Sequence, residues 1–298
     1  MVCAIIVLFN PDLIHLRSLV SVLTKQVGNI ILVDNTPNNI KKYDEIYCSE
    51  NVIYIDLKDN LGIARAHNEG IKEAIKLNYE YVIIFDQDSQ VENDFVRSLV
   101  NIDKEIRVID SKIAAIGPAY IDIKTNIKAP IIRFNGLKVE RIQPNLDEVF
   151  TAADYIISSG TLIRTEVFQI VGLMMEELFI DYVDTEWGLR AKKKGYHCYV
   201  ANKVIMHHSI GDQSLKVPFS KKYVNIHSDF RKYFIIRNAF YLVLYSNLQL
   251  NWRIVQISKT FMYFIFLCLF VSPRWNNVKI FIQAFKDAII KKMGKGSM

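Results

Sequence analysis

The 298-residue sequence contains neither of the two common glycine-rich phosphate loops. No Gly-x-Gly-x-x-Gly follows the first expected strand, which disfavours a nicotinamide-dependent oxidoreductase, and no Gly-x-x-x-x-Gly-Lys-Ser/Thr occurs. Paired cysteines are missing too, because the four cysteines are scattered: Cys3, Cys48, Cys198 and Cys268. The scattered cysteines and the lack of a cleavable signal peptide ahead of the first strand favour a reducing, cytoplasmic setting. If a nucleotide binds here, a metal ion must neutralise more of its phosphate charge.

Acidic residues are almost absent from the last part of the chain. Residues 215–298 carry 14 Lys and Arg against 2 Asp and Glu, whereas residues 1–214 carry 23 against 29. Large apolar and aromatic residues separate these cations, which suits an anionic membrane surface better than nucleic acid. The most apolar run, 261–271, has 11 residues, and a spanning helix needs roughly 20. We therefore expect attachment to the membrane surface without crossing; packing on the rest of the protein or in a homodimer is the alternative.

The first 120 residues alternate short β-branched runs with helical patterns. Strands are expected at 2–9, 29–34, 52–57 and 81–86, and helices over 11–28 and 62–77. This alternation predicts an α/β protein whose ligands bind at the carboxyl ends of parallel strands. The pattern is less regular from 115 to 160, resumes with a strand and a helix over 153–168, and becomes basic and helical past 215.

Two expected strands end on acids. Asp34 follows the apolar run 31–33, and Asp86 and Asp88 follow the run 82–85 with Ser89 beside them. In a parallel sheet these side chains would share one rim. Hard carboxylate oxygens can hold a divalent cation that in turn holds a phosphate. A solvated strand end is the simpler interpretation of such a pair, since Asp also favours turns and caps.

Eight motifs in order resemble the inverting family 2 glycosyltransferases of the GT-A fold, and specifically the bacterial rhamnosyltransferase branch. They are VLFNP (7–11), ILVDN (31–35), NLGIARAHNEGI (60–71), FDQDS (85–89), SSGTLI (158–163), FIDYVDTEWGLR (179–190), HHSIGD (207–212) and RKYFIIRN (231–238). The resemblance covers residues 2–238. It implies a Rossmann-like, mostly parallel central sheet with helices on both faces. The catalytic domain would span 1–214, with a nucleotide-sugar half (about 1–115) and an acceptor half (about 116–214), followed by a C-terminal helical, basic and apolar region (215–298).

The resemblance also implies roles for individual residues. Asp86 and Asp88 would bind Mg²⁺ or Mn²⁺ that bridges the donor diphosphate, with His208 as a further ligand. Asp34 would accept from the N3–H of a pyrimidine, with a cap on the following loop as the alternative. The nucleotide-binding set is Phe9, Asn10, Asp34, Asn60, Arg65, Asn68, Asp86 and Gln87.

The resemblance also implies which residues would bind phosphate and which would bind the acceptor. Arg231 and Arg237 would clamp phosphate, although a solvated basic face explains them equally well. The acceptor-binding set is Ser159, Gly160, Glu186 and Trp187, and Trp187 is as well explained by core packing as by stacking on a sugar.

Inversion requires a carboxylate that removes the proton of the acceptor hydroxyl. The family's usual Glu-Asp-x-Asp base motif is altered here. Counting back from Arg190 places the base at Asp184, preceded by Val183, and Asp181 is the runner-up.

The function implied by the resemblance is metal-dependent transfer of L-rhamnose from dTDP-β-L-rhamnose to a lipid-linked glycan in surface polysaccharide (O-antigen or capsule) synthesis. The enzyme would lie at the inner face of the bacterial membrane. A relative using another nucleotide-sugar, such as a UDP-hexose, would look similar. A non-catalytic nucleotide-binding relative is the remaining alternative.

Overall fold

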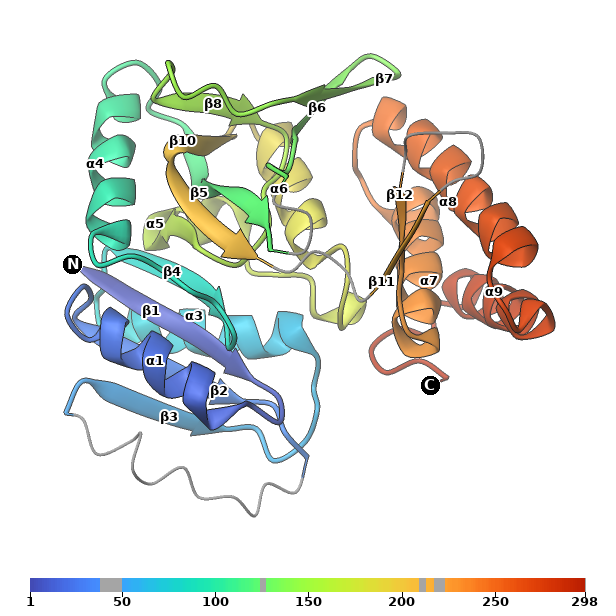
Figure 1. Cartoon of the computed structure of the whole chain (residues 1–298), viewed down its shortest axis with the longest axis horizontal. Coiled ribbons are helices and arrows are strands. Elements are labelled where there is room, and N and C mark those ends of the chain that lie inside the picture. The colour runs from blue at the N-terminus through green and yellow to red at the C-terminus, as the bar shows by residue number, and fades with distance from the viewer. Residues whose placement is uncertain (38–49, 124–126, 209–212, 217–222, 298) are drawn as a thin grey trace.

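The computed structural model describes residues 1–37, 50–123, 127–208, 213–216 and 223–297. Its first part alternates strands and helices (Figure 1). The elements up to η1 are β1 Val2–Leu8, α1 Leu13–Leu23, β2 Asn29–Asp34, β3 Val52–Asp56, α3 Ile63–Lys76, β4 Tyr81–Asp86, α4 Phe95–Arg107, β5 Ile113–Asp122, β6 Ile131–Asn135, β7 Lys138–Ile142, β8 Phe150–Ala153, β9 Thr161–Arg164, α5 Thr165–Val171 and η1 Glu176–Leu178. The remaining elements are α6 Val183–Lys193, β10 His197–His208, β11 Gln213–Lys216, β12 Tyr223–Ile226, α7 Asp229–Tyr245, α8 Leu250–Phe270 and α9 Arg274–Ile289.

An eight-stranded sheet forms the centre of the catalytic part, in the order β3-β2-β1-β4-β9-β5-β10-β8. The pairs β1–β2, β1–β4, β2–β3 and β5–β10 are parallel, whereas β9 runs antiparallel to β4 and β5, and β8 antiparallel to β10. The predicted mostly parallel α/β sheet is therefore confirmed. Because β1, β2 and β4 are parallel neighbours, their last residues, Leu8, Asp34 and Asp86, meet at one rim.

Both faces of the sheet are covered, which explains why its central strands are apolar throughout. Alternate residues of β1 point to opposite faces. Cys3, Ile5 and Val7 belong to the buried cluster that includes residues of α3, α5 and α6, and the intervening positions belong to the cluster that includes residues of α1 and α4. Each fully buried Leu or Ile contributes about 1.5–3 kcal/mol relative to an exposed one.

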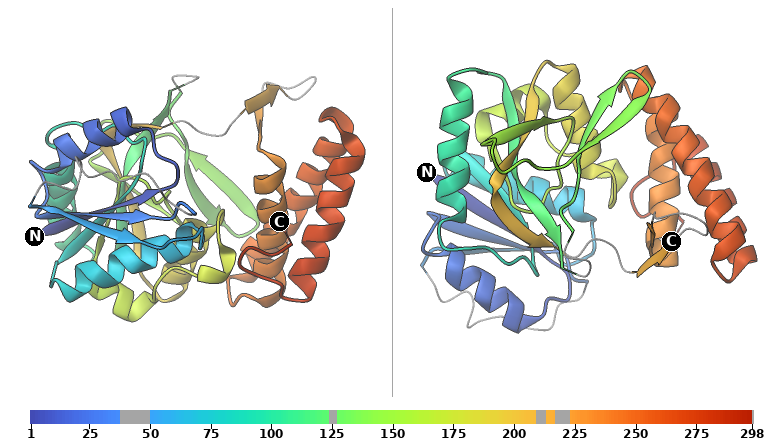
Figure 2. Two further views of the ribbon diagram at one scale, coloured as in Figure 1. Left: turned by 90° about the horizontal axis from the view of Figure 1, so that it is seen from below. Right: turned by 45° about the horizontal axis from the view of Figure 1, so that its top comes forward.

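Helices α7, α8 and α9 lie to one side of the sheet (Figures 1 and 2). An aromatic cluster holds α7 to α9, where Phe240 contacts Phe281 and Phe285 edge-on, and α8 joins it as Phe264 stacks on Phe281 at 3.9 Å. The hairpin β6–β7 reaches toward α8 (Figure 1), and Asn251 Nδ2 donates to the Gly136 carbonyl at 2.9 Å. The C-terminal helices therefore contact the catalytic part directly.

Helix α8 is longer than the apolar run that suggested it. It has 21 residues and is long and apolar enough to cross a membrane by length and composition, with 22% of its most apolar window buried. The expectation that this segment is too short to span is therefore wrong. The 11-residue count stopped at Lys259, whereas the helix continues through Gln256 and Trp252, which are buried against the protein.

Candidate active site

The turn after β4 is fixed by buried hydroxyl groups. The Asp86 backbone N–H donates to Ser159 Oγ at 3.2 Å, and Ser159 Oγ lies 2.9 Å from Ser89 Oγ. Ser89 and Ser159 are buried, whereas Asp86 is half-buried and Asp88 is exposed. The two carboxylates therefore stand at the surface on a rigid turn, at the position expected for a strand-end metal site.

A side-chain amide joins this turn to the end of β1. The Phe9 N–H donates to Gln87 Oε1 at 2.7 Å, and Gln87 Nε2 donates to the Phe9 carbonyl at 3.1 Å. This pair spans 78 positions of sequence and fixes the rim where β1 and β4 end. Asn10 follows with a positive φ of 47°, and its N–H donates to Thr36 Oγ1 at 2.9 Å.

A cavity of about 530 Å³, the donor pocket, opens at this rim. Four predicted nucleotide-binding residues line it: Phe9, Asn60, Asp86 and Gln87. The opposite wall consists of Phe179, Ile180 and Phe230, which reasoning from sequence did not assign to the site. Phe179 stacks on Phe234 at 5.1 Å, so this wall is anchored in α7. The pocket has the size of a small-molecule site and the mostly apolar lining with a few polar groups that is typical of one.

Gly62 sits at the start of α3 beside this wall, with a φ of +88°. A Cβ there would lie 2.6 Å from the Phe179 ring and 2.7 Å from its carbonyl oxygen. Only glycine fits both the backbone conformation and the contact. Gly62 is therefore a packing glycine.

Asp34 is completely buried at the end of β2. Its Oδ1 accepts from the Thr36 N–H at 2.9 Å and its Oδ2 from the Tyr54 hydroxyl at 2.7 Å. The carboxylate thus caps the loop after β2, which is the alternative named for it, and its contact with a pyrimidine stays a prediction. The next residue, Asn35, lines the donor pocket and donates to Asn60 Oδ1 at 3.0 Å.

Arg65 and Asn68 are not among the residues that line the donor pocket, and their contact with a nucleotide stays a prediction. Arg65 Nη1 donates to Glu176 Oε2 at 2.7 Å. Asn68 is buried; its Nδ2 donates to Glu176 Oε1 and to the Met174 carbonyl, and its Oδ1 accepts from the Met174 N–H. Both side chains instead hold the segment that leads into η1.

The segment from Phe179 to Tyr182 has a strained backbone. Phe179, Asp181 and Tyr182 all have positive φ, at 66°, 62° and 66°, a conformation that costs non-glycine residues energy and recurs at functional sites. Asn238 of α7 stabilises it, because its Nδ2 donates to the carbonyls of Leu178, Ile180 and Asp181 at 2.8 to 3.0 Å.

Asp184, the predicted base, follows this segment in the first turn of α6. Its Oδ1 accepts from the Thr185 N–H at 2.7 Å, and the Ser158 N–H also donates to the carboxylate. Burial raises the pKa of Asp184 above its ordinary value, and the negative charge of Asp181 adds to the increase. A carboxylate with a raised pKa accepts a proton more readily, which suits a general base.

Asp181, the runner-up, is already paired. Arg231 Nη2 donates to Asp181 Oδ1 at 2.5 Å, and Arg231 Nε lies 3.4 Å from Oδ2. The ion pair joins α7 to the strained segment. The geometry therefore favours Asp184 over Asp181 as the residue that accepts a proton.

Arg237, the second predicted phosphate clamp, is fully buried, and its contact with phosphate stays a prediction. Its Nη1 donates to the Gly294 carbonyl at 2.6 Å, and its Nη2 donates to the Leu178 carbonyl at 3.1 Å. It thus bonds to backbone carbonyls inside the protein. Arg231 is partly exposed, so its contact with phosphate stays a prediction.

Three of the predicted acceptor-binding residues are internal, and each has a packing or pairing role in the structure. Ser159 is fully buried beneath the turn after β4. Glu186 is 2% exposed and pairs with Arg190, which donates to both carboxylate oxygens at 2.8 and 2.9 Å. Trp187 is 3% exposed, packs on Phe168 and donates from Nε1 to the Gly172 carbonyl, so core packing is the correct interpretation.

Gly160, the fourth predicted acceptor-binding residue, is buried and has a φ of +73°. A Cβ there would lie 2.7 Å from Met206 Sδ, and the Gly160 N–H donates to the Ile84 carbonyl at 2.6 Å. Glycine therefore lets the segment before β9 lie close to both Met206 of β10 and Ile84 of β4.

The carboxyl end of β10 lies beside the aspartate turn, because His207 forms an isolated antiparallel bridge with Gln90. The side chain of His208, predicted as a metal ligand, lies outside the described residues, as do residues 209–212 of the HHSIGD motif. Within the described part of the chain, no three His, Cys, Asp or Glu side chains gather as a metal site. The donors present, the Asp86 and Asp88 carboxylates, are hard oxygen ligands that fit Mg²⁺ or Mn²⁺ with coordination positions left for phosphate oxygens.

The mostly parallel sheet, the carboxylates after β4, the adjacent pocket and the half-buried Asp184 on α6 define a GT-A glycosyltransferase. Residues 3–168 match the family model for glycosyl transferase family 2, and the chain belongs to this family. It is a glycosyltransferase, so the predicted family and enzyme class are confirmed.

Two curated proteins are similar in sequence. The chain is 37% identical over 279 residues to the dTDP-rhamnosyl transferase RfbF of Shigella flexneri, covering 93% of this chain and 90% of that protein. It is 22% identical over 237 residues to the low-salt glycan biosynthesis hexosyltransferase Agl10 of Haloferax volcanii, covering 78% of this chain and 74% of that protein.

Solved structures share the fold. Residues 1–349 of S. aureus TarS in complex with UDP-GlcNAc superpose with a TM-score of 0.58 at 16% identity, covering 97% of this chain and 80% of that chain. GalNAc-T7 with UDP, GalNAc and Mn²⁺ gives a TM-score of 0.56 at 16% identity, covering 70% of this chain and 44% of that chain.

Proposed function

We propose that the protein transfers L-rhamnose from dTDP-β-L-rhamnose to a hydroxyl of a lipid-linked glycan during the synthesis of bacterial surface polysaccharide. The observation that carries the proposal is the 37% identity to a dTDP-rhamnosyl transferase along 93% of the chain. The donor pocket supports it, since about 530 Å³ is enough for a nucleotide and its sugar.

In the proposed reaction, the acceptor hydroxyl oxygen forms a bond to the anomeric carbon as the bond from that carbon to the diphosphate oxygen breaks. Asp184 accepts the hydroxyl proton, and the leaving dTDP takes the electron pair of the broken bond. Attack opposite to the leaving group inverts the β-linked donor to an α-linked product.

The Asp86 and Asp88 carboxylates would hold Mg²⁺ or Mn²⁺ at the end of β4. When bound, the cation supplies a positive charge that stabilises the leaving diphosphate. The hydroxyl groups of Ser89 and Ser159 keep the turn in place, and the Phe9–Gln87 amide pair holds the adjacent rim.

Donor choice is tested with purified protein, Mn²⁺ and a panel of dTDP-rhamnose, UDP-glucose and UDP-N-acetylglucosamine, by measuring the released nucleoside diphosphate. We expect dTDP release from dTDP-rhamnose to exceed UDP release from either hexose donor by at least ~10-fold, the scale of one lost polar contact. Preferential UDP release would identify a family 2 enzyme for another donor. Release from no donor, despite dTDP raising the melting temperature, would support a non-catalytic nucleotide-binding protein.

We also propose that α8 and α9 attach the enzyme to the cytoplasmic face of the membrane. Exposed apolar residues form a stripe on α8: Ile254, Phe261, Met262, Ile265 and Leu269. A second group lies on α9: Trp275, Ile282, Phe285 and Ile289. The basic charge of this region complements anionic lipid, and each cation near such a surface contributes about 1 kcal/mol.

Membrane attachment is tested by co-sedimentation with phosphatidylcholine vesicles that contain one third phosphatidylglycerol. We expect the double variant Met262→Glu/Ile265→Glu to lose most of the binding, because two charges would enter the apolar layer. The matched control is Val108→Glu/Ile109→Glu, which places the same charges on exposed apolar residues of the catalytic part. Equal pelleting of both variants would contradict the proposal, and a halved mass of the α8 variant in solution would identify a dimer interface instead.

A further inference from the structure

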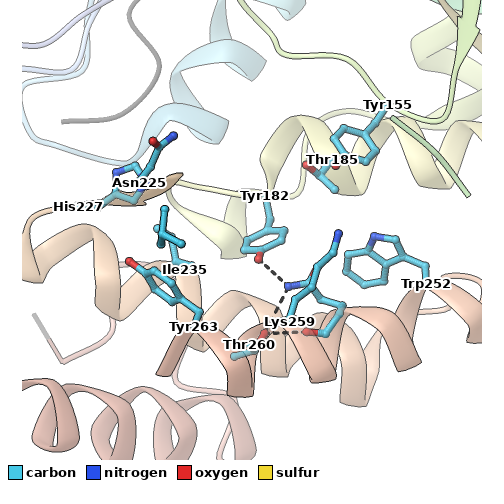
Figure 3. Close-up of a pocket in the computed structure, with 12 residues that line it drawn as sticks. Tyr155, Tyr182, Thr185, Asn225, His227, Ile235, Trp252, Lys259, Thr260 and Tyr263 are labelled. Carbon is cyan, nitrogen blue, oxygen red and sulfur yellow. Dashed lines mark hydrogen bonds between the residues drawn. The ribbon is translucent and has the colours of Figure 1, made fainter. Parts of the chain in front are cut away.

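A second pocket, of about 300 Å³, lies between the catalytic part and the C-terminal helices (Figure 3). Tyr155, Tyr182 and Thr185 line it from the catalytic side, and Trp252, Gln256 and Lys259 line it from α8. We name it the interdomain pocket. Its walls combine aromatic rings with hydroxyl and amide groups, which is the chemistry that recognises a sugar ring and its hydroxyls.

The interdomain pocket shares the segment 182–185 with the proposed base, Asp184, whose own side chain lines a separate small cavity with Ser158 and Trp187. One continuous segment serves both cavities, since Phe179 and Ile180 line the donor pocket while Tyr182 and Thr185 line the interdomain pocket. Asp184 lies between the last two in sequence, and its Oδ1 accepts from the Thr185 N–H. An acceptor held in the interdomain pocket would therefore have its reactive hydroxyl near Asp184.

One hydrogen bond joins the two sides of this pocket, and a second, within α8, supports it. Gln256 Nε2 donates to the Tyr182 hydroxyl at 2.7 Å, and Thr260 Oγ1 donates to the Gln256 carbonyl at 2.9 Å (Figure 3). Gln256 is 7% and Trp252 2% exposed. The polar face of α8 is thus buried against the strained segment that positions Asp184, so the C-terminal helices complete this cavity.

Lys259 contributes a cationic group to the lining of the interdomain pocket. Its side chain extends from α8 into the pocket between Tyr182 and Trp252 (Figure 3), and its Nζ lies 5.6 Å from the centre of the Phe134 ring. It forms no ion pair with any residue in the described part of the chain. Burial lowers the pKa of Lys259, and the positive charge of Arg141 on β7 lowers it further. No Asp or Glu is among the described residues that line this pocket, so the charge of Lys259 can attract an anion there.

We propose that the interdomain pocket binds the acceptor and that Lys259 recognises an anionic group on it, either the phosphate of a glycosyl phosphate or the carboxylate of an acidic sugar. The inference rests on the proposed glycosyl transfer and adds the chemical class of the acceptor. Lys259 is a specificity residue, because it would touch the bound acceptor without taking part in the proton transfer.

The test is direct binding of three sugars to the full chain, with dTDP and Mn²⁺ present to fill the donor pocket. Glucose 1-phosphate represents the phosphate, glucuronate the carboxylate, and methyl glucoside the neutral ring. We expect at least one anionic sugar to bind at least ~10-fold more tightly than methyl glucoside, and Lys259→Met to remove that difference, since charge-assisted hydrogen bonds are about twice as strong as neutral ones.

Two further variants separate recognition from folding. Lys259→Arg keeps the charge and should retain most of the preference, whereas Lys279→Met removes an exposed charge on α9 and should change nothing. Tighter binding of glucose 1-phosphate alone would identify a phosphate-bearing acceptor, and tighter binding of glucuronate alone an acidic sugar. Equal binding of all three sugars by the wild-type protein would overturn the proposal. Failure of the proposed function has a different signature, which is that dTDP itself does not bind.

Discussion

Asp184→Asn is expected to lower the rate of sugar transfer at least ~10²-fold, the usual scale of general-base catalysis, and to leave dTDP affinity nearly unchanged. Asparagine keeps the size of the side chain and an oxygen that can accept from the Thr185 and Ser158 N–H groups. It cannot take up the acceptor proton. The measurement is turnover with saturating donor, together with dTDP binding followed by thermal shift.

Asp181→Asn is the matched control for this variant. It removes the same charge three residues away, but from a carboxylate that is paired with Arg231. We expect a smaller loss of turnover, through loosening of the strained segment. If Asp181→Asn were the variant that binds dTDP but fails to turn over, and Asp184→Asn stayed active, the base would be Asp181.

The raised pKa of Asp184 gives this prediction a pH dependence. Transfer should fall as pH decreases through the raised pKa, because only the ionised carboxylate accepts a proton. The stability of the folded state changes with pH in the opposite direction to the rate of transfer. A carboxyl group with a higher pKa in the folded state destabilises that state when both states are ionised, and the cost disappears as pH falls below the unfolded value. Asp184→Asn should therefore melt at the same or a higher temperature at pH 7, which excludes unfolding as the cause of lost turnover.

The local parts of the site follow from sequence because they depend on neighbouring residues. Alternating strands and helices predict the parallel sheet, and a parallel sheet brings the ends of β2 and β4 to one rim. The aspartate turn and the acid on α6 lie where these patterns place them.

The sequence does not reveal partners that are far away along the chain. Asn68 occupies a helix position that suits a ligand contact, yet it bonds to Glu176, 108 positions away. Arg237 looks like an exposed cation in a basic segment but donates to carbonyls inside the protein. The position of a polar residue in a helical pattern shows on which face of the helix it lies. Only the fold shows which residues pack against that face.

Contacts between distant parts of the chain also account for the site residues that the sequence did not reveal. Phe179 and Phe230 lie in or beside quoted motifs, but nothing local shows that they form the wall of the donor pocket. The interdomain pocket combines residues separated by about a hundred positions, such as Tyr155 and Lys259. Counting apolar residues also cut α8 short, because polar residues that face protein interrupt the run without ending the helix.

Asp86→Ala and Asp88→Ala are each expected to lower metal-dependent transfer by ~10²-fold or more, because a Lewis-acid cation contributes several kcal/mol to transition-state stabilisation. The carboxylates are the only acids on the turn after β4 and stand at its surface. Neither takes part in packing the core, so both variants should fold. Asp94→Ala, which removes an exposed aspartate six residues further on, is the matched control and should keep full activity.

A binding measurement makes the metal role independent of turnover. Mn²⁺ should raise the melting temperature of the wild-type protein and of Asp94→Ala in the presence of dTDP, by mass action on the folded state. The Asp86→Ala and Asp88→Ala variants should lose that increase, because the cation would have lost half of its described carboxylate ligands. Near wild-type turnover of either variant in EDTA would show that transfer does not depend on a metal at this turn. In that case the positive charge opposite the diphosphate would have to come from a side chain, and Arg231, partly exposed beside Asp181, is the first to replace.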